Sequence, residues 1–348
     1  MTIDLVVSTG SPAGVGPEVS LVAATRVPRG VRLLLLGDVD VLRERALAVG
    51  LDARAIASVR SAEEAFGRTR EPGRVVVLSP HGKLRKSSRR PGFPSPEGGA
   101  AALGFIDEGL DLVVAGRAAA LVTGPVSKAE IVSSGVPGSA LFLGHTEHLM
   151  RRLGRPSVTM AFWSRAFTTS LVTTHLALSD VPAAITKPAV VRAIVDTAEF
   201  LASVRPRGAR PVRLVVSGVN PHAGEDGLLG TEELRVVGPA IATARARLAR
   251  AGVPVDVSGP VPAESALRLA SEGHYDGVVA MFHDQATIAM KLTGFGEAVN
   301  VSLGLPVVRT SVDHGTAFDR AGKGTADARG MLEAVRLAAR MVRGRAPR

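Results

Sequence analysis

The chain has 348 residues, 46% of them hydrophobic and 21% charged, which is the composition of a soluble globular protein with a sizeable core. It contains no cysteine, so disulfides, thiolate metal sites and thiol catalysis are excluded. The net charge is +10, but aromatic residues make up only 3% and most basic residues are spread along the chain, so we expect no nucleic-acid partner.

The N-terminal residues MTIDLVVSTG show no basic segment followed by an apolar stretch, and so no signal peptide. The longest apolar runs, such as RLLLLGDVDVL, are too short to span a bilayer. We therefore expect a cytoplasmic protein with no membrane partner.

From residue 4 onward, short apolar runs alternate with longer helical patterns. We expect strands at 4–9, 32–38, 74–79, 120–124, 157–162, 169–175, 213–222, 255–259, 277–284 and 298–304. Helices are expected near 17–26, 97–118, 187–204, 231–251, 263–272 and 329–343. This alternation predicts an α/β fold with a mainly parallel sheet and helices on both faces.

Two glycine-containing segments are candidates for ligand contact. SPAGVGPE, at 11–18, joins the first strand to the first helix, a position suited to an anion or a nucleotide. The stretch VRTSVDHGTAFDRAGKGTAD, at 308–327, has neither a helical nor a strand period. Neither segment matches the Rossmann or the Walker pattern.

Three of the eight histidines lie at or just past the carboxyl end of an expected strand: His175, His222 and His283. Ligands of open α/β sheets bind at these ends, so the three imidazoles are candidates for one catalytic metal site. Asp284 is a candidate further ligand, partner of a ligand or base. The alternative for any single histidine is a local hydrogen bond, and we interpret His81, His148 and His274 in that way.

A second set of residues suits an anionic ligand. His145 and Thr146, in GHTEH, are candidate hydrogen-bond donors, although the same residues also fit a helix start capped by Thr146. Lys291, Asn300 and Arg309 combine the side chains that bind phosphate or carboxylate, and a surface salt bridge is the alternative for each.

Seven motifs resemble, in order, those of the 4-hydroxythreonine-4-phosphate dehydrogenase family of vitamin B6 biosynthesis. They are STGSPAGVGPE, LVTGPVSK, LGHTEHL, TTHLALSDVPAAIT, NPHAGEDGLLGTEE, YDGVVAMFHDQ and NVSLGLPVVRTSVDHGTAFDRAGKGTAD, spanning residues 8 to 327. The last motif is also similar to a loop of isocitrate and isopropylmalate dehydrogenases. The resemblance implies a two-lobed α/β/α fold of that group, with lobes at 1–126 plus 279–348 and at 127–278.

The resemblance also implies roles for particular residues. The divalent metal, zinc with magnesium, manganese or cobalt as alternatives, would be bound by His175, His222 and His283, the last from the partner subunit of a homodimer with a shared active site. The substrate would be bound by His145, Thr146, Lys291, Asn300 and Arg309. NAD, with NADP as the alternative, would be bound by His314, Gly315, Thr316, Ala317, Asp319, Gly322 and Lys323.

The reaction implied is oxidation of 4-phosphooxy-L-threonine at its C3 hydroxyl, followed by decarboxylation to 3-amino-2-oxopropyl phosphate. Asp284 and Lys291 are the candidate proton carriers. The sequence departs from the family at Ser11, where an aspartate is usual, and after HDQ, where IAMK is similar to relatives acting on D-threonate or D-erythronate 4-phosphate. Oxidation of such a sugar acid is the alternative, and metal-dependent hydrolysis or a non-catalytic regulator remain further alternatives.

Overall fold

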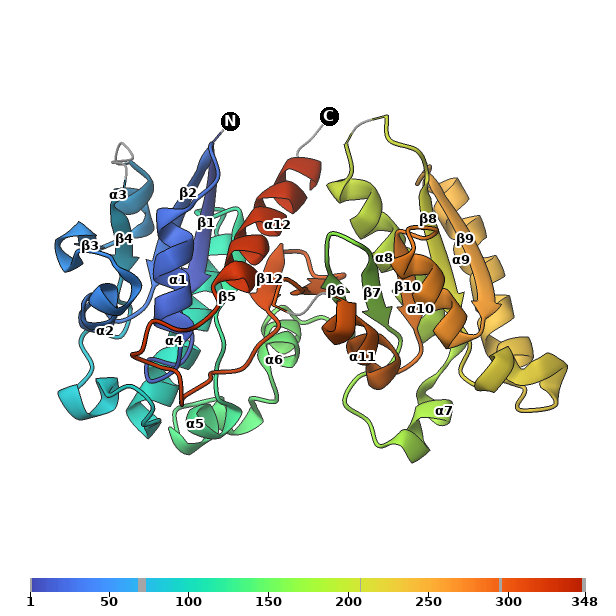
Figure 1. Cartoon of the computed structure of the whole chain (residues 1–348), viewed down its shortest axis with the longest axis horizontal. Coiled ribbons are helices and arrows are strands. Elements are labelled where there is room, and N and C mark those ends of the chain that lie inside the picture. The colour runs from blue at the N-terminus through green and yellow to red at the C-terminus, as the bar shows by residue number, and fades with distance from the viewer. Residues whose placement is uncertain (1, 68–72, 207, 294–295, 346–348) are drawn as a thin grey trace. The chain divides into compact units, whose positions relative to one another are not determined.

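The structure is a computed structural model that describes residues 2–67, 73–206, 208–293 and 296–345. It divides into two compact units (Figure 1). Unit 1 comprises Met1–Pro156 and Leu305–Arg343, and unit 2 comprises Ser157–Gly304 with the residues from Gly344 onward.

The sheet of unit 1 has the strand order β3-β4-β2-β1-β5-β12. Its strands are β1 (Ile3–Ser8), β2 (Val31–Leu36), β3 (Ile56–Val59), β4 (Val75–Leu78), β5 (Ala120–Thr123) and β12 (Arg309–Val312). Every neighbouring pair is parallel, so the carboxyl ends of all six strands meet at one edge of this sheet.

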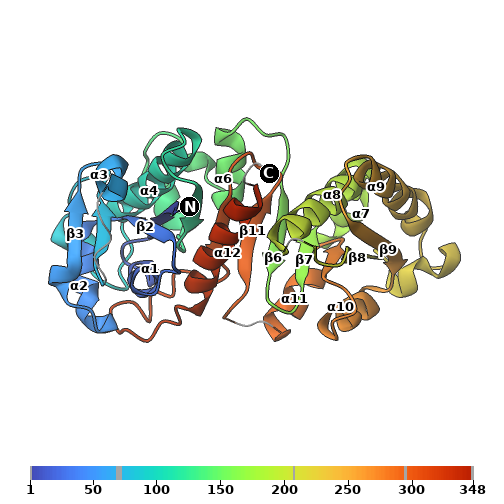
Figure 2. The same ribbon diagram turned by 90° about the horizontal axis from the view of Figure 1, so that it is seen from above.

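Helices cover both faces of this sheet, with α3 and α4 on one face and α1, α2 and α12 on the other (Figure 2). The helices of unit 1 are α1 (Gly16–Thr25), α2 (Val39–Ala46), α3 (Ala62–Gly67), α4 (Pro96–Val114), α5 (Lys128–Ser133), α6 (His145–Arg152) and α12 (Arg329–Arg345). Several starts are set by the sequence: Ser95 caps α4, which then begins with Pro96, and Ser127 caps α5.

The sheet of unit 2 has the order β11-β6-β7-β10-β8-β9. Its strands are β6 (Thr159–Trp163), β7 (Thr168–Leu171), β8 (Val212–Ser217), β9 (Val255–Val261), β10 (Gly277–Ala280) and β11 (Val299–Leu303). Strand β6 is antiparallel to both β7 and β11, whereas β7, β10, β8 and β9 are mutually parallel. The mainly parallel α/β fold is thus confirmed.

In unit 2, helices α8 and α9 lie on one face of the sheet and α10 and α11 on the other (Figure 2). The helices of unit 2 are α7 (Val181–Ala184), α8 (Lys187–Val204), α9 (Gly238–Arg250), α10 (Ala263–Ser271) and α11 (His283–Thr293). The core beneath α10 and α11 includes Phe162, Phe167 and Met290, all nearly inaccessible to solvent.

All ten expected strand regions contain a strand, but the interpretation of 308–327 as wholly aperiodic was wrong. Its first residues form β12, in which Arg309, Thr310 and Ser311 are buried. Because these side chains are polar, the strand has no apolar run from which it could be predicted. They tolerate burial because they are hydrogen-bonded: Thr310 Oγ1 donates to Ala334 O (2.9 Å) and Ser311 Oγ donates to Thr123 O (3.1 Å).

The boundaries of the two units differ from the expected lobes, which divide after residues 126 and 278. Helix α5 contacts α4, so it belongs with unit 1. Strand β11 pairs with β6 along its whole length, and α11 packs on β7, so both belong with unit 2. As a result, the three candidate metal histidines lie together in unit 2, and His145, Thr146 and Arg309 lie in unit 1.

Candidate active-site residues

The three candidate metal histidines follow three adjacent strands of unit 2. His175 comes after β7, His222 after β8 and His283 after β10, and β10 lies between the other two strands. Because β7, β10 and β8 are parallel, their carboxyl ends meet at one edge of the sheet. This topology gives the three histidines a common edge, as the strand-end pattern predicted.

Two of these histidines are in contact within one chain. The ring centroids of His175 and His283 lie 5.6 Å apart. Two imidazoles that bind one ion at about 2.1 Å have centroids roughly 5 Å apart, so this spacing suits a shared ligand. His283 is the first residue of α11, not the end of a strand, and its Nδ1 lies 2.7 Å from Asp284 Oδ1. That contact leaves Nε2 for a ligand, so it favours an orienting role for Asp284 over a ligand or base.

His222 lies in a turn of unusual backbone conformation. His222 has φ 51° and ψ 27°, and the residues that follow it up to Asp226 also have positive φ. The left-handed region costs about 1–2 kcal/mol per residue without glycine, so other contacts must hold this turn. Glu233 fixes the residues just before the turn: its Oε1 accepts from the backbone N–H groups of Val219 (2.7 Å) and Asn220 (2.8 Å).

Within the described part of one chain, no three His, Asp or Glu side chains converge closely enough to hold a metal ion. The structure therefore brings together His175 and His283, and it does not add His222 to them. His175, like His222, has a positive φ, of 42°, so strained backbone accompanies two of the three candidates.

Lys291 and Asn300 also lie in unit 2. Lys291 lies on α11, two helical turns after His283, with Thr287 between them on the same side of the helix. Thr287 Oγ1 lies 3.4 Å from His283 Nδ1, which confirms that this side of α11 is shared with the histidine. Asn300 lies on β11, opposite Phe162 of β6.

Arg309 is a buried cation of unit 1. Its side chain is 2% exposed, and its Nη2 donates to Thr123 Oγ1 at 2.7 Å. Burial lowers the pKa of Arg309 to about 9, and the nearby carboxylate of Glu147 opposes this shift. The guanidinium thus stays charged at neutral pH inside the protein, where an anionic ligand stabilises it most strongly.

His145 lies close to this charge, on the first turn of α6. Its Nε2 is buried and has no hydrogen-bond partner among the described residues. Burial lowers the pKa of His145 well below its usual value, and the charges of Arg309, His148 and Lys128 lower it further. His145 is thus a buried side chain beside positive charges, an arrangement that suits an anionic ligand.

Lys128 was missed by the sequence interpretation. It is the first residue of α5, and its Cε would lie 3.7 Å from a Cβ built on Gly144, the residue before His145. Its place in the LVTGPVSK motif was the available signal, since only six lysines occur in the chain. Thr146 is not the helix cap, because α6 begins at His145 and Gly144 occupies the cap position.

His148 has a structural role that agrees with its interpretation from sequence. Its Nε2 lies 2.7 Å from Asp107 Oδ1 of α4, and its Nδ1 lies 3.1 Å from Arg151 Nη2. Since arginine can only donate, Nδ1 accepts and Nε2 donates to the carboxylate. The imidazole thus fixes α6 against α4 and so positions His145.

The expected cofactor loop follows β12 in unit 1. His314, Asp319, Gly322 and Lys323 are exposed, and Ala317 has a positive φ of 41°. The loop touches the first glycine segment, because Val15 N donates to Thr316 O at 2.9 Å. Since β1 and β12 both run parallel to β5, this loop and the 11–18 segment lie at the same edge of the sheet.

Ser11 is enclosed and does not face a ligand. Its side chain is fully buried, and its Oγ accepts from Ser127 N at 3.1 Å. Beside it lies the buried carboxylate of Glu130, which accepts from Ser95 N at 3.2 Å. Burial raises the pKa of Glu130, and hydrogen bonds from Ser11 and Ser95 oppose this shift. In this chain, therefore, a carboxylate from α5 occupies the neighbourhood of the missing aspartate.

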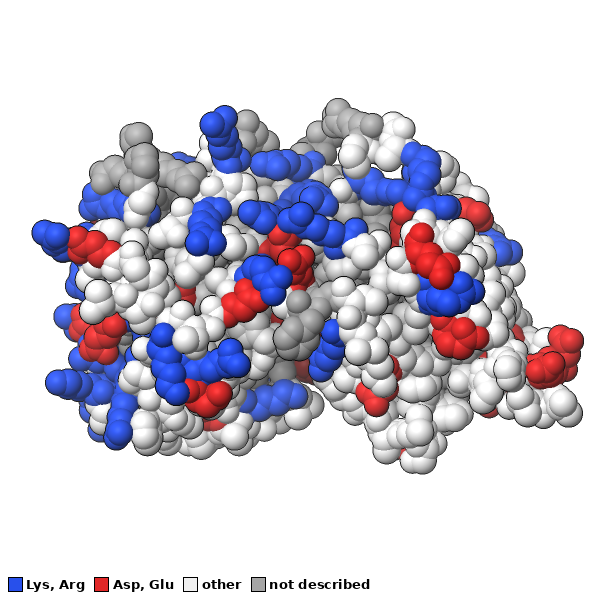
Figure 3. All heavy atoms as spheres, in the orientation of Figure 1, with Lys and Arg blue, Asp and Glu red and all other residues white. Residues whose placement is uncertain are grey.

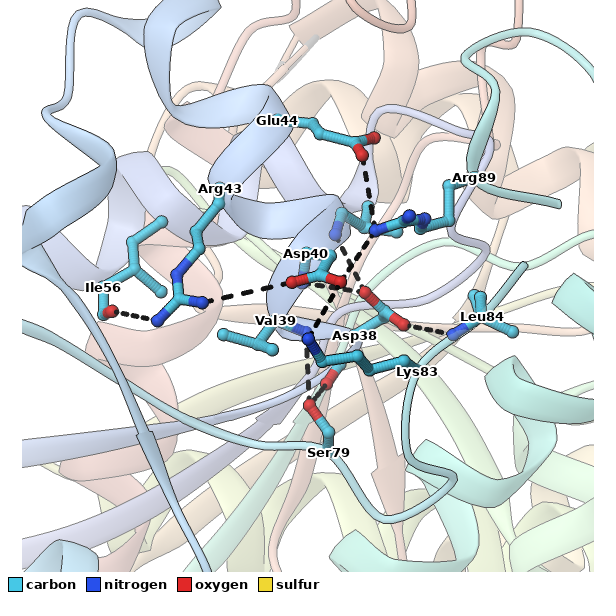
Figure 4. Close-up of polar contacts among 12 residues, drawn as sticks. Asp38, Val39, Asp40, Arg43, Glu44, Ile56, Ser79, Lys83, Leu84 and Arg89 are labelled. Carbon is cyan, nitrogen blue, oxygen red and sulfur yellow. Dashed lines mark hydrogen bonds and ion pairs between the residues drawn. The ribbon is translucent and has the colours of Figure 1, made fainter. Parts of the chain in front are cut away.

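A Rossmann-type ribose contact at the end of β2 is also excluded. Asp38, at that position, is 2% exposed and accepts from three backbone N–H groups, those of Asp40, Val41 and Leu84 (Figure 4). Next to it, Asp40 forms ion pairs with Arg89 (2.9 Å) and Lys83 (3.5 Å). Two of the five basic residues of the GKLRKSSRR segment, Lys83 and Arg89, thus pair with acidic residues of α2.

Basic side chains also lie near acidic ones on the face of the molecule that Figure 3 shows. Figure 3 shows Lys and Arg side chains over much of the visible face, with Asp and Glu side chains among them. In the described residues, no helix is both long and apolar enough to cross a membrane.

The sequence matches the family model described as pyridoxal phosphate biosynthetic protein PdxA over residues 30–338. The chain belongs to this family. It is 39% identical, over 95% of its length and 94% of the relative, to a 4-hydroxythreonine-4-phosphate dehydrogenase of Desulfosudis oleivorans. The family shown by these matches is one of dehydrogenases, so the chain is an enzyme of that class.

Solved structures agree with this assignment. The fold matches that of a 4-hydroxythreonine-4-phosphate dehydrogenase from Klebsiella pneumoniae with a TM-score of 0.78 and 31% identity, covering 98% of this chain and 100% of that one. It also matches a terephthalate 1,2-cis-dihydrodiol dehydrogenase from Burkholderia xenovorans with a TM-score of 0.65 and 27% identity, covering 98% of each chain.

Proposed function

We propose that this enzyme oxidises 4-phosphooxy-L-threonine at its C3 hydroxyl with NAD, and that decarboxylation then gives 3-amino-2-oxopropyl phosphate. The observation that carries this proposal is the buried guanidinium of Arg309 beside the buried imidazole of His145 in a member of the PdxA family. Such a group suits a substrate with a phosphate or carboxylate, because a buried guanidinium binds these planar or tetrahedral anions with charge-assisted hydrogen bonds.

We propose that His145, Thr146 and Arg309 bind an anionic group of the substrate, assisted by Lys128. Lys291 and Asn300 of unit 2 complete the expected set of substrate residues. The neutral imidazole of His145 donates a hydrogen bond through Nε2 without adding a second full charge beside Arg309, since its pKa is low. An anion in this position lowers the energy of every cation around it.

We propose that the residues at the strand ends of unit 2 bind a divalent metal, for which one chain brings two ligands, His175 and His283, together. His175 and His283 would hold it through ring nitrogens, with Asp284 orienting the ring of His283. Imidazole ligands suit zinc, while magnesium, manganese and cobalt remain alternatives. When bound, such a cation polarises the hydroxyl oxygen of the substrate and the carbonyl oxygen of the product.

We propose Lys291 as the carrier that returns a proton to carbon after carbon dioxide leaves. Its side chain is exposed on the same side of α11 as His283, whereas the carboxylate of Asp284 is committed to His283 Nδ1. An ammonium group at this position donates a proton and is then reprotonated by solvent.

We further propose that the enzyme is a homodimer and that a second copy of the chain completes the metal site. In the described part of unit 2, every exposed large hydrophobic side chain follows one of the three histidines: Leu176, Leu178, Leu228, Leu229, Leu234, Ile288 and Leu292. Helix α10 contacts both α11 and the turn after His222. Apolar side chains concentrated on such neighbouring segments are typical of a subunit interface.

The alternative substrate within the same chemistry is D-threonate or D-erythronate 4-phosphate, which lacks the amine. Measuring NADH formation on purified enzyme with each phosphorylated acid, with and without added zinc, separates the two. We expect kcat/KM for 4-phosphooxy-L-threonine to be at least tenfold higher. A higher kcat/KM for threonate phosphate would show that the sugar acid, and not 4-phosphooxy-L-threonine, is the substrate. Release of phosphate without formation of NADH would overturn the dehydrogenase proposal.

A further inference from the structure

The carboxylate of Glu18 is one of the most deeply buried charges of unit 1, and the proposed reaction does not use it. Glu18 lies in the first turn of α1, at the end of the SPAGVGPE segment, and is 1% exposed. A buried carboxylate is strongly destabilising unless hydrogen bonds and an opposite charge surround it. Its partners therefore show what this charge holds in place.

Both oxygens of Glu18 accept hydrogen bonds from the expected cofactor loop. Oε1 accepts from the backbone N–H of Gly322, and Oε2 accepts from that of Gly324 at 3.0 Å. The Nε of Arg45, on α2, lies 3.8 Å from Oε1, and its side chain is only 4% exposed. Glu18 thus joins a buried cation on one side to two loop amides on the other.

Arg45 extends this contact to a third segment. Its Nη2 lies within hydrogen-bond distance of Pro12 O (3.4 Å) and Arg89 O (3.3 Å). Burial lowers the pKa of Arg45, while Glu18 and Glu44 oppose the shift. A further bond joins these segments, from Gly92 N to Ala13 O at 2.9 Å.

Apart from these amides, the loop is held by the hydrogen bond from Val15 N to Thr316 O (2.9 Å) and by backbone packing. Most of its side chains between Asp313 and Asp327 are exposed or half-buried, and Ala321 is the one fully buried side chain of this described stretch. Its backbone instead lies close against the end of α2. A Cβ on Gly324 would lie 1.9 Å from Ala48 O, and φ there is +65°, so only glycine fits.

We propose that Glu18, paired with Arg45, is a positioning residue that holds the 313–327 loop in the conformation that binds the dinucleotide. This inference rests on the proposed binding of NAD by that loop. The segment SPAGVGPE accordingly acts through the loop, and not by direct contact of Glu18 with an anion. A fixed loop lowers the entropy lost when the cofactor binds, so the effect belongs to cofactor affinity.

The test is Glu18→Gln. The side chain of glutamine has one accepting oxygen, and its second polar atom is an NH2 nitrogen that can only donate. That nitrogen would face a backbone N–H group, so one loop amide loses its hydrogen-bond partner. Because hydrogen bonds to charged groups are among the stronger ones, we expect KM for NAD and Kd for NADH, from fluorescence titration, to rise about tenfold or more. At saturating NAD, kcat should stay within about threefold, and KM for the phosphorylated acid should not move.

The matched control is Glu333→Gln, since Glu333 is also a buried carboxylate of unit 1 that pairs with an arginine, Arg336 at 2.6 Å. It should leave Kd for NADH unchanged. If Glu18→Gln does not fold, Gly324→Ala displaces the loop while leaving Glu18 and Arg45 intact, and it should raise KM for NAD in the same way. Unchanged NADH affinity in both folded variants, or equal losses in the control, would overturn the inference. Wild-type enzyme that binds no NADH would instead overturn the proposed function of the loop.

Discussion

The two groups of candidate residues differ in how completely one chain prepares them. In unit 1, Arg309 is buried and hydrogen-bonded to Thr123, and His145 is held by a helix that His148 fixes to α4. In unit 2, His175 and His222 are exposed, and His283 remains 39% exposed. The proposed anion site is therefore held in place largely within one chain, whereas the proposed metal site would need a bound ion and a further subunit to gain its final geometry.

The largest expected effect on activity comes from substitution of an exposed histidine of unit 2. His222→Ala should lower turnover by about a thousandfold or more, because loss of one of three metal ligands removes most of the bound metal. Metal content and kcat should fall together, while the circular dichroism spectrum stays unchanged. His274→Ala is the control, since this exposed histidine of unit 2 only approaches Glu272, at 3.8 Å. Unaltered metal content in His222→Ala would contradict the metal assignment.

Loss of the buried Arg309 of unit 1 should lower activity almost as strongly. Arg309→Met removes the buried charge and should lower kcat/KM for the phosphorylated acid by roughly a hundred- to a thousandfold. Arg309→Lys keeps the charge but not the planar fork, and should recover only part of this loss. Arg336→Met, at a half-exposed arginine, serves as the control. Equal kinetics for Arg309→Lys and wild type would show that no bidentate contact is made.

The need for a second subunit is tested on α11. Ile288 and Leu292 are 59% and 81% exposed, so aspartate at either position costs the isolated chain little but places a charge in the proposed interface. We expect Ile288→Asp with Leu292→Asp to give monomers by light scattering and at least a tenfold loss of activity. Leu47→Asp is the comparison, because Leu47 is 86% exposed and lies in unit 1. An active monomer would refute the shared site.

The smallest effect concerns pH. The folded protein holds the pKa of His145 below the ordinary value of about 6.5, so below that pH the unfolded chain binds a proton that the folded chain does not. The free energy of unfolding should therefore fall as the pH falls, by at most about 1.4 kcal/mol per pH unit from this group. Between pH 7 and 5.5, the Tm of His145→Gln should fall less than that of the wild type. Added phosphate should bring the two falls in Tm closer together. A steeper fall in the variant would contradict the assignment.

The sequence predicted most of the strands because they are continuous apolar runs, and it predicted the common edge of the three histidines because each follows such a run. It failed at β12, whose buried Arg309, Thr310 and Ser311 are stabilised by partners far away in the chain. It also failed to single out Lys128, since an exposed lysine at a helix start has no local pattern. The left-handed turn at His222 was likewise not predicted, because His222, Ala223, Glu225 and Asp226 are residues that rarely adopt this conformation.

Unit 1 is assembled from both ends of the chain, and this has a consequence for synthesis. Strand β12 pairs with β5, although 185 residues separate Thr123 at the end of β5 from Arg309 at the start of β12. A ribosome therefore releases the whole of Ser157–Gly304, which can collapse as a continuous segment, while β5 still has an unpaired edge. The nascent protein would thus expose an aggregation-prone strand until its last residues emerge, and a chaperone that covers that edge would matter most in this interval.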